Sequence, residues 1–245
     1  MGLGFLCGLS VLRRGMFRVL WPLVLVMHLD AEPIGQAQSS EVLAALARID
    51  QGSLAAWSFS ADFLQEDSSR TVHFGPGKPA ERQVRLVSVD GREPSAEELE
   101  DFSENRQEQE SEDNSDFGIR DLIDEASLEF THEDAEGAHF RFVPRFAIEG
   151  QPEPQKDLVG ELVLDREDGF IRSLEVRSEG VFKPKFGIKL TKLRFGFRFQ
   201  VLDDGTPAPE YVITEIKGRA YLLANFDEKV EIHYHSFGLQ QPSDE

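Results

Sequence analysis

Residues 191–203 read Thr-Lys-Leu-Arg-Phe-Gly-Phe-Arg-Phe-Gln-Val-Leu-Asp, and this stretch decides the fold class. Apolar side chains stand at every second position from Leu193 to Val201 and alternate with polar or small residues. A period of two predicts a β-strand with one buried side and one side in water. The buried side carries phenylalanine, and the side in water carries lysine and arginine.

The alternation extends in both directions along the chain. Residues 182–190 alternate in the opposite phase, which indicates either one strand with a bulge or two strands that meet at a turn. Similar patterns recur at 57–63, 72–74, 84–88, 140–148, 158–164, 170–176, 212–216 and 230–234. We predict a mainly β protein with about nine to eleven strands in a single curved antiparallel sheet, forming an open half-barrel with two or three short helices as a lid.

The sequence predicts one short helix that ends near Gln51 and the start of a second helix at Ser95. Val42, Leu46 and Ile49 have the spacing of a short amphipathic helix that ends near Gln51. Ser95 and Glu98 form the pattern of a capping box at the start of a second helix. Residues 97–116 are strongly acidic with few apolar side chains, so we expect an acidic insertion whose second half is a mobile, solvated loop.

Residues 1–37 have the pattern of a secretory signal peptide. Basic residues precede an apolar run at 19–27, and small residues precede a cleavage position after Ala37. Cleavage after Ala31, translation from Met16 and a twin-arginine signal at 13–14 are the alternatives. The apolar run is too short for a spanning helix. We therefore expect a periplasmic protein in which residues 38–245 form one domain.

Composition and motifs exclude several functions. The net charge of −19 disfavours nucleic acid as a partner. The single cysteine, Cys7, lies in the predicted leader, so a disulfide scaffold is not expected. The sequence has no nucleophile elbow, phosphate-binding glycine loop or dinucleotide fingerprint, and we predict neither an enzyme nor a cofactor.

One set of metal-ligating residue types falls on the last predicted strand. Glu231, His233 and His235 share a face because residues two apart in a strand point the same way. The alternate residues, which include Ile232 and Tyr234, form the buried face, so we expect the histidines to face water and predict no metal site.

The order of these features resembles the periplasmic lipoprotein-carrier superfamily. The stretch Val-Asp-Gly-Arg-Glu-Pro-Ser at 89–95, followed by Glu97, Glu98 and Phe102, is similar to one common among uncharacterised relatives of the outer-membrane lipoprotein carrier and receptor. The resemblance covers residues 39–237. It implies an open barrel whose concave side, covered by helices, takes acyl chains.

The phenylalanine face is the predicted ligand site, because each buried methylene of an acyl chain contributes about 0.8 kcal/mol without a directional partner. The residues expected to line this cavity are Trp57, Phe59, Phe63, Phe140, Phe142, Phe195, Phe197 and Phe199. The alternative is that they fill a closed core.

A cationic stripe is the second predicted binding surface, and its residues are Lys183, Lys185, Lys189, Lys192, Arg194 and Arg198. It could meet a phosphate headgroup, an anionic membrane surface or an acidic partner. The acidic segment of the same chain could instead fold over the stripe and screen it. The remaining interpretation is that these side chains only solubilise the outer face and protect strands from edge pairing.

The functional expectation is a non-enzymatic, monomeric periplasmic protein that binds a lipid or lipoprotein acyl chain. An envelope protein is a further possible partner, and the protein could also contact the membrane surface peripherally. The alternative is a periplasmic protein–protein interaction module with a filled core and charged docking faces.

Overall fold

The computed structural model describes residues 34–51, 54–77, 83–111, 119–146, 153–184, 187–220 and 224–239. The predicted leader, except for its last four residues, lies outside these ranges. Within them the chain is mainly β, as the sequence predicts. No helix in the described ranges has the length and apolar character needed to cross a membrane.

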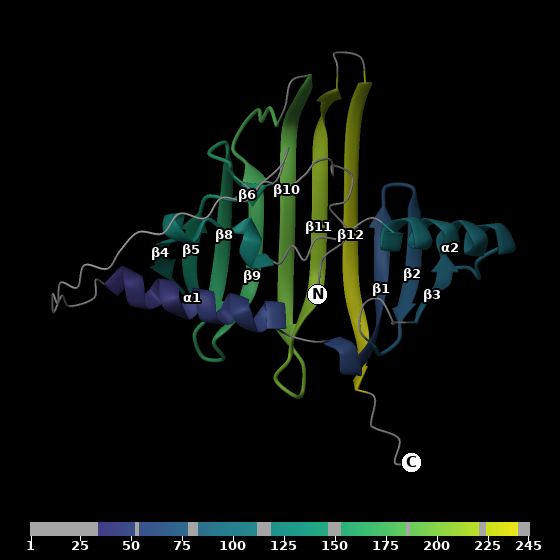
Figure 1. The fold of residues 1–245 in the computed structure, drawn as a ribbon, viewed down its shortest axis with the longest axis horizontal. Coiled ribbons are helices and arrows are strands. Elements are labelled where there is room, and N and C mark those ends of the chain that lie inside the picture. Colours follow the sequence, from purple (N-terminus) through teal and green to yellow (C-terminus); the bar gives the residue numbers. More distant parts are fainter. Residues whose placement is uncertain are drawn as a thin grey trace, which may run out of the picture.

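Ten strands form one antiparallel sheet in the order β3-β2-β1-β12-β11-β10-β9-β8-β5-β4. Figure 1 shows this sheet face on. The sheet is open because its two edge strands, β3 and β4, do not pair with each other. Its strands are β1 (Trp57–Gln65), β2 (Ser68–Phe74), β3 (Val84–Val89), β4 (Glu129–Glu133), β5 (Ala138–Phe142), β8 (Leu158–Asp165), β9 (Phe170–Ser178), β10 (Ile188–Val201), β11 (Pro207–Ala220) and β12 (Ala224–Leu239).

The remaining elements are short or helical. Strands β6 (Arg145–Phe146) and β7 (Glu153–Pro154) pair in a separate two-stranded sheet. Among the described residues, the α-helices are α1 (Ile34–Gln51) and α2 (Ala96–Ser111), and the 3-10 turns are η1 (Leu54–Ala56), η2 (Ile119–Leu122) and η3 (Glu125–Ser127).

Strand β10 follows the predicted alternation. Leu193, Phe195, Phe197 and Phe199 are all buried, while the residues between them face the other side. The pairing with β11 shifts register between Leu190 and Lys192, so a bulge brings residues 188–190 into the same strand as 193–199. The bulge therefore holds for residues 188–190, whereas Phe182 forms an antiparallel bridge with Leu190, so the chain turns between these two residues.

Helix α1 covers the half of the sheet around β4, β9 and β11 (Figure 1). Val42, Ala45 and Leu46, spaced as one helical face, are at most 2% exposed. They belong to the main hydrophobic cluster together with Phe140, Phe195 and other inward-facing side chains. The helix ends at Gln51, as predicted, and it begins at Ile34, before the predicted cleavage position.

Helix α2 lies at the other end of the sheet, beside β1, β2 and β3 (Figure 1). Phe102 packs on a small cluster formed by Val72, Leu86 and Val89. The helix continues to Ser111, into the half of the acidic segment that was expected to be a loop, and residues 112–118 lie outside the described ranges. Composition alone misplaced this boundary because glutamate, glutamine and arginine are good helix formers even where little can be buried.

Candidate functional site

The eight residues predicted to line a cavity lie on the inner face of the sheet, but most of them are core residues. Trp57, Phe59, Phe140, Phe142, Phe195, Phe197 and Phe199 are at most 9% exposed. Five of these seven pack in the main cluster together with side chains of α1, whereas Trp57 and Phe59 pack with Leu54 and Ala208 in a second cluster. Phe63 differs, because it is half-buried and lines a pocket.

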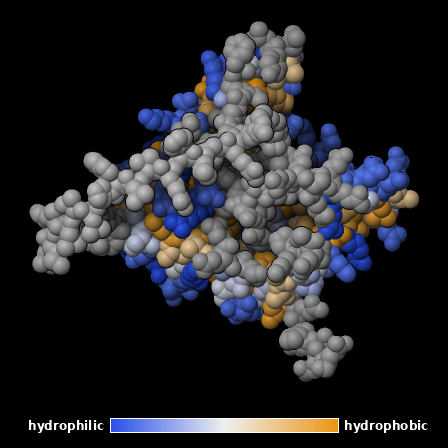
Figure 2. Space-filling model, in the orientation of Figure 1, coloured by the Kyte–Doolittle hydropathy of each residue, from blue (hydrophilic) through white to orange (hydrophobic). Residues whose placement is uncertain are grey.

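This pocket, which we call the α2 pocket, lies between α2 and the strands β1–β3 and has a volume of about 500 Å³. Its apolar walls come from Phe63, Val72, Phe74, Val84, Phe102 and Val230. Its polar lining comes from Gln65, Ser68, Arg70, Asn105 and Arg106. At this end of the molecule, Figure 2 shows hydrophobic side chains at the surface beside the hydrophilic ones.

The capping box predicted from the sequence fixes the start of α2. The Ser95 backbone N–H donates to Glu98 Oε2 at 2.7 Å, and the Glu98 N–H donates to Ser95 Oγ at 3.2 Å. Arg92 donates to both oxygens of the same carboxylate at 2.7 and 2.8 Å. These hydrogen bonds, led by the one from Arg92, lower the pKa of Glu98 to about 2.

A turn at residues 90–91 ties this helix start to β2. Asp90 Oδ1 accepts the Ser69 N–H at 2.7 Å, and the Asp90 N–H donates to the Ser69 carbonyl at 2.8 Å. Asp90 and Gly91 both have positive φ, of 50° and 73°. Asp and Gly tolerate this conformation, which explains why the Asp-Gly pair stands where the chain leaves β3 for α2.

Two arginines among the lining residues give the α2 pocket a cationic component. Arg70 is exposed and lies opposite Phe63 in the β1–β2 register, so the two side chains share the inner face. Arg106 is half-buried, and its Nη1 donates to the Val84 carbonyl at 3.5 Å. An apolar wall beside guanidinium groups fits a ligand with an alkyl part and an acidic head.

Two residues of the predicted cationic stripe, Lys192 and Arg194, form cross-strand ion pairs on the outer face. Arg194 on β10 bonds Glu175 on β9 at 2.7 Å, and Lys192 pairs with Glu215 on β11. The contact with Glu175 is the largest cause that raises the pKa of Arg194. Arg198 is exposed, and Lys185 lies outside the described residues. Strands β11 and β12 stand between β10 and β1, so α2 does not cover this stripe.

Lys183 and Lys189 lie at one end of β10, where they line a broad pocket of about 1050 Å³. Lys217 and Arg219 of β11 line the same pocket, and Lys217 pairs there with Asp227. The sequence grouped the first two lysines with the stripe. The structure instead brings them together with cations from the neighbouring strand.

The Glu231, His233 and His235 set does not converge on one point. Glu231 pairs with Lys229, and its other oxygen is 3.7 Å from His233 Nε2. His235 Nε2 faces Asp62 of β1 at 3.2 Å, and Ser236 follows with a φ of 56° at an irregularity in the β1–β12 pairing.

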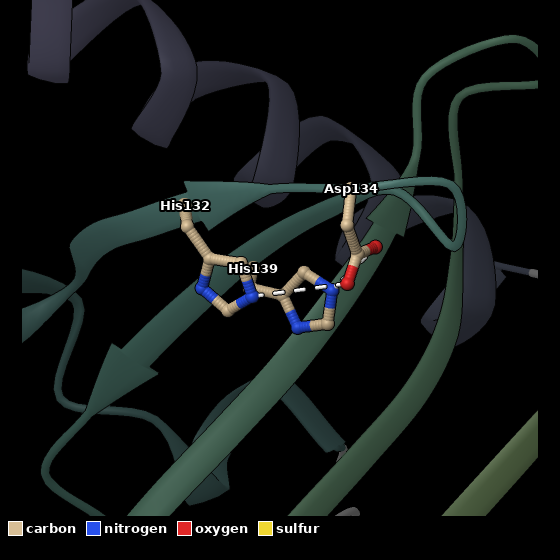
Figure 3. A group of neighbouring side chains, drawn as sticks. All are labelled: His132, Asp134 and His139. Atoms are coloured by element: carbon tan, nitrogen blue, oxygen red, sulfur yellow. Dashed lines mark hydrogen bonds and ion pairs between the residues drawn. The ribbon is translucent and has the colours of Figure 1, made fainter.

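Sequence reasoning missed a second group, formed by His132, Asp134 and His139 on the β4–β5 hairpin (Figure 3). Their ligand atoms lie within 4.8 Å of one another. Three metal-ligating residue types within eight positions were the available signal, but the strand register that brings them together was not readable from the sequence.

The protein belongs to the class of open antiparallel sheets with helices on one face. The sequence matches no protein-family model and no curated protein. Among solved structures, the chain has a weak similarity to the MucA/MucB complex of Pseudomonas aeruginosa. The identity is 12%, the match covers 80% of this chain and 93% of that chain, and the TM-score is 0.22, a value too low to bear on fold or function.

Proposed function

We propose that this protein is a non-enzymatic, periplasmic binding protein that holds the acyl chain of a lipid or lipoprotein in the α2 pocket. The observation that carries the proposal is the pocket itself, which combines six apolar side chains with two arginines. Its volume of about 500 Å³ falls within the usual range of small-molecule sites. Of the eight residues predicted to line the cavity, Phe63 is the one that lines the α2 pocket. The other seven are not part of the proposed site.

The chemistry of the lining supports an acidic amphiphile. An alkyl chain against Phe63, Phe74 and Phe102 would gain about 0.8 kcal/mol per buried methylene. A carboxylate or phosphate at the same ligand's head would pair with a guanidinium, whose planar donors match both groups. The signal-peptide pattern of residues 1–37 supports export to a compartment where such ligands occur.

The experiment combines native mass spectrometry with fatty-acid uptake. The exported protein is analysed intact, extracted with organic solvent, and then titrated with a fluorescent fatty acid. We expect a co-purifying acyl species and saturable uptake. Phe102→Ala removes part of the apolar wall and should weaken uptake, whereas Leu99→Ala, on the same helix and 44% exposed, should not.

A second variant tests whether an arginine of the α2 pocket binds the acidic head group. Arg70→Ala removes a charged hydrogen-bond donor that is exposed to solvent, which should weaken binding by about 0.2–1 kcal/mol. Arg85→Ala is the matched control, because Arg85 is exposed on β3 and alternates with the inward-facing Val84 and Leu86. Equal uptake by the Arg70 and Arg85 variants would show that Arg70 does not bind the head group.

The second candidate function is the protein–protein interaction module, which is favoured by the filled core under α1. Phe140, Phe195 and Phe197 are buried there against other side chains, so that half of the inner face has the character of a closed core. A clean apo mass with no uptake of fatty acid or phospholipid would support this candidate and contradict the proposal.

A further inference from the structure

The β4–β5 hairpin gathers two histidines and an aspartate (Figure 3). Strand β4 is the edge strand at the opposite end of the sheet from β3 and the α2 pocket. His132 is on β4, His139 is on β5, and Asp134 begins the turn between them. Their side chains are partly in water, with His132 59%, Asp134 47% and His139 20% exposed. The group is therefore accessible from solvent.

A bulge puts the two imidazoles on the same face. The register of β4 and β5 shifts between Phe130 and His132, so Thr131 is the extra residue and His132 lies opposite His139. The rings stack with centroids 4.2 Å apart and an interplanar angle of 13°. Without the bulge, Thr131 would lie opposite His139. Bulges often re-aim a side chain in this way beside functional sites.

The turn holds the carboxylate in place. The Asp134 N–H donates to the Gly137 carbonyl at 3.0 Å, and Asp134 Oδ1 accepts the Glu136 N–H at 2.8 Å. Gly137 has a φ of 142°, and a Cβ there would stand 2.3 Å from the Leu164 carbonyl oxygen, so only glycine fits. The position of Asp134 is thus set by the backbone and does not depend on the histidines.

Thr131 fixes which nitrogen of His132 is available. The Thr131 hydroxyl donates its one hydrogen to the His139 carbonyl at 3.1 Å, so towards His132 Nδ1, also 3.1 Å away, it acts as an acceptor. In the neutral ring, this contact assigns the proton of His132 to Nδ1 and leaves the Nε2 lone pair to bind a metal. This orientation by a hydrogen bond from the other ring nitrogen is usual for metal-binding histidines.

The two Nε2 atoms both face the Asp134 carboxylate. His139 Nε2 is 3.0 Å from Oδ1, which is a hydrogen-bond distance. His132 Nε2 is 3.8 Å from Oδ2, too far for a hydrogen bond, so a lone pair faces a negative oxygen across a gap. A cation in this gap would bind the lone pair of His132 Nε2 and offset the negative charge of Asp134 Oδ2.

We propose that His132, Asp134 and His139 bind a divalent transition-metal ion, with Zn²⁺ as the reference ion. Two imidazole nitrogens and one carboxylate oxygen are ligand types that zinc accepts at about 2.0–2.2 Å, and a fourth position would remain for water. Ligand atoms now within 4.8 Å of one another would move closer together to reach that geometry. His139 would bind after transferring its Nε2 proton to water.

The surroundings favour a cation. The nearby Arg166 is engaged by Glu133 at 3.1 Å and by Glu41 at 3.6 Å, so its charge is offset. The net charge of the chain, −19, also attracts a cation from solution.

The test is calorimetric titration of the full chain with Zn²⁺, with NMR of the imidazole nitrogens as a second readout. We expect one Zn²⁺ per chain, with the Nε2 signals of His132 and His139 shifting together. His132→Ala, at an exposed position, should lower affinity at least about 100-fold, more than the 10–100-fold typical of losing an outer-shell partner. His233→Ala, an exposed histidine on β12, is the matched control.

A positioning variant separates metal binding from an ordinary ion pair. Thr131→Val removes the hydroxyl but no ligand, so it should weaken Zn²⁺ about 10–100-fold and change the tautomer signal of His132. The proposal is overturned if His132→Ala binds Zn²⁺ as the wild type does. It is also overturned if Zn²⁺ leaves the nitrogen signals unchanged while acid alone shifts them, since the group would then be a protonated histidine–aspartate pair. Neither result bears on the α2 pocket.

Discussion

Gly160 shows how tightly single residues on the inner face are fitted. It lies directly opposite Phe142 in the β5–β8 register, and the phenyl ring covers it. A Cβ at Gly160 would stand 2.2 Å from ring atoms of Phe142, which is 2% exposed and cannot move into open space. Because Gly160 on β8 has no Cβ, the ring of Phe142 on β5 can pack directly on its backbone.

We predict that Gly160→Ala lowers the free energy of unfolding by about 1–3 kcal/mol, the usual cost of overpacking a filled core. Urea unfolding followed by circular dichroism measures the effect. Gly180→Ala is the control, because a Cβ there meets nothing within 4 Å. An unchanged urea midpoint for Gly160→Ala would mean that Phe142 is not held in this packing.

At the scale of elements, the start of α2 depends on one carboxylate. Glu98 has its pKa lowered to about 2 from a usual 4.5, chiefly by Arg92 and then by the Ser95 N–H. A lowered pKa in the folded state stabilises the fold above the usual pKa. This contribution is lost as the pH falls from about 4.5 towards 2.

We predict that the amide signal of Ser95 titrates with Glu98 between these pH values and that Glu98→Gln abolishes the titration. The same variant should loosen the first turn of α2 at neutral pH, seen as faster amide exchange. Glu97→Gln, also in the first turn, should leave both readouts as in the wild type. If the amide signal of Ser95 in the wild type does not change between these pH values, the capping box is contradicted.

The elements also show how far sequence reasoning reaches. The alternation at 191–203, the capping box at Ser95 and the end of α1 were predictable because each depends on residues close in the chain. The α2 pocket and the histidine hairpin were not, because each depends on register. A one-residue bulge at Thr131 decides which face His132 occupies, and nothing in the sequence marks it.

At the scale of the whole molecule, the first strand pairs with the last. Strand β1 pairs with β12, and Trp57 lies opposite Leu239. This long-range pairing attaches β1–β3 and α2 to the rest of the sheet. Phe63 and Phe74 contact both the main cluster and the small cluster under α2, which joins the two cores.

We therefore predict one cooperative unfolding transition. Of the two tryptophans in the sequence, Trp57 lies in the described ranges, so in a variant that lacks residues 1–37, and with them Trp21, the fluorescence of Trp57 reports on β1. The fluorescence and far-ultraviolet circular dichroism curves should have the same urea midpoint. A fluorescence transition at lower urea would show that β1–β3 separates before the rest of the sheet unfolds.

Photo-crosslinking would show whether an acyl chain enters the α2 pocket. A fatty acid with a diazirine on its tail is bound to the wild-type protein, irradiated, and its attachment sites are mapped by mass spectrometry. We expect labels at Phe63, Phe74 and Phe102, and we expect excess unlabelled fatty acid to suppress them. Labels confined to the outer face, or none above background, would contradict the proposal.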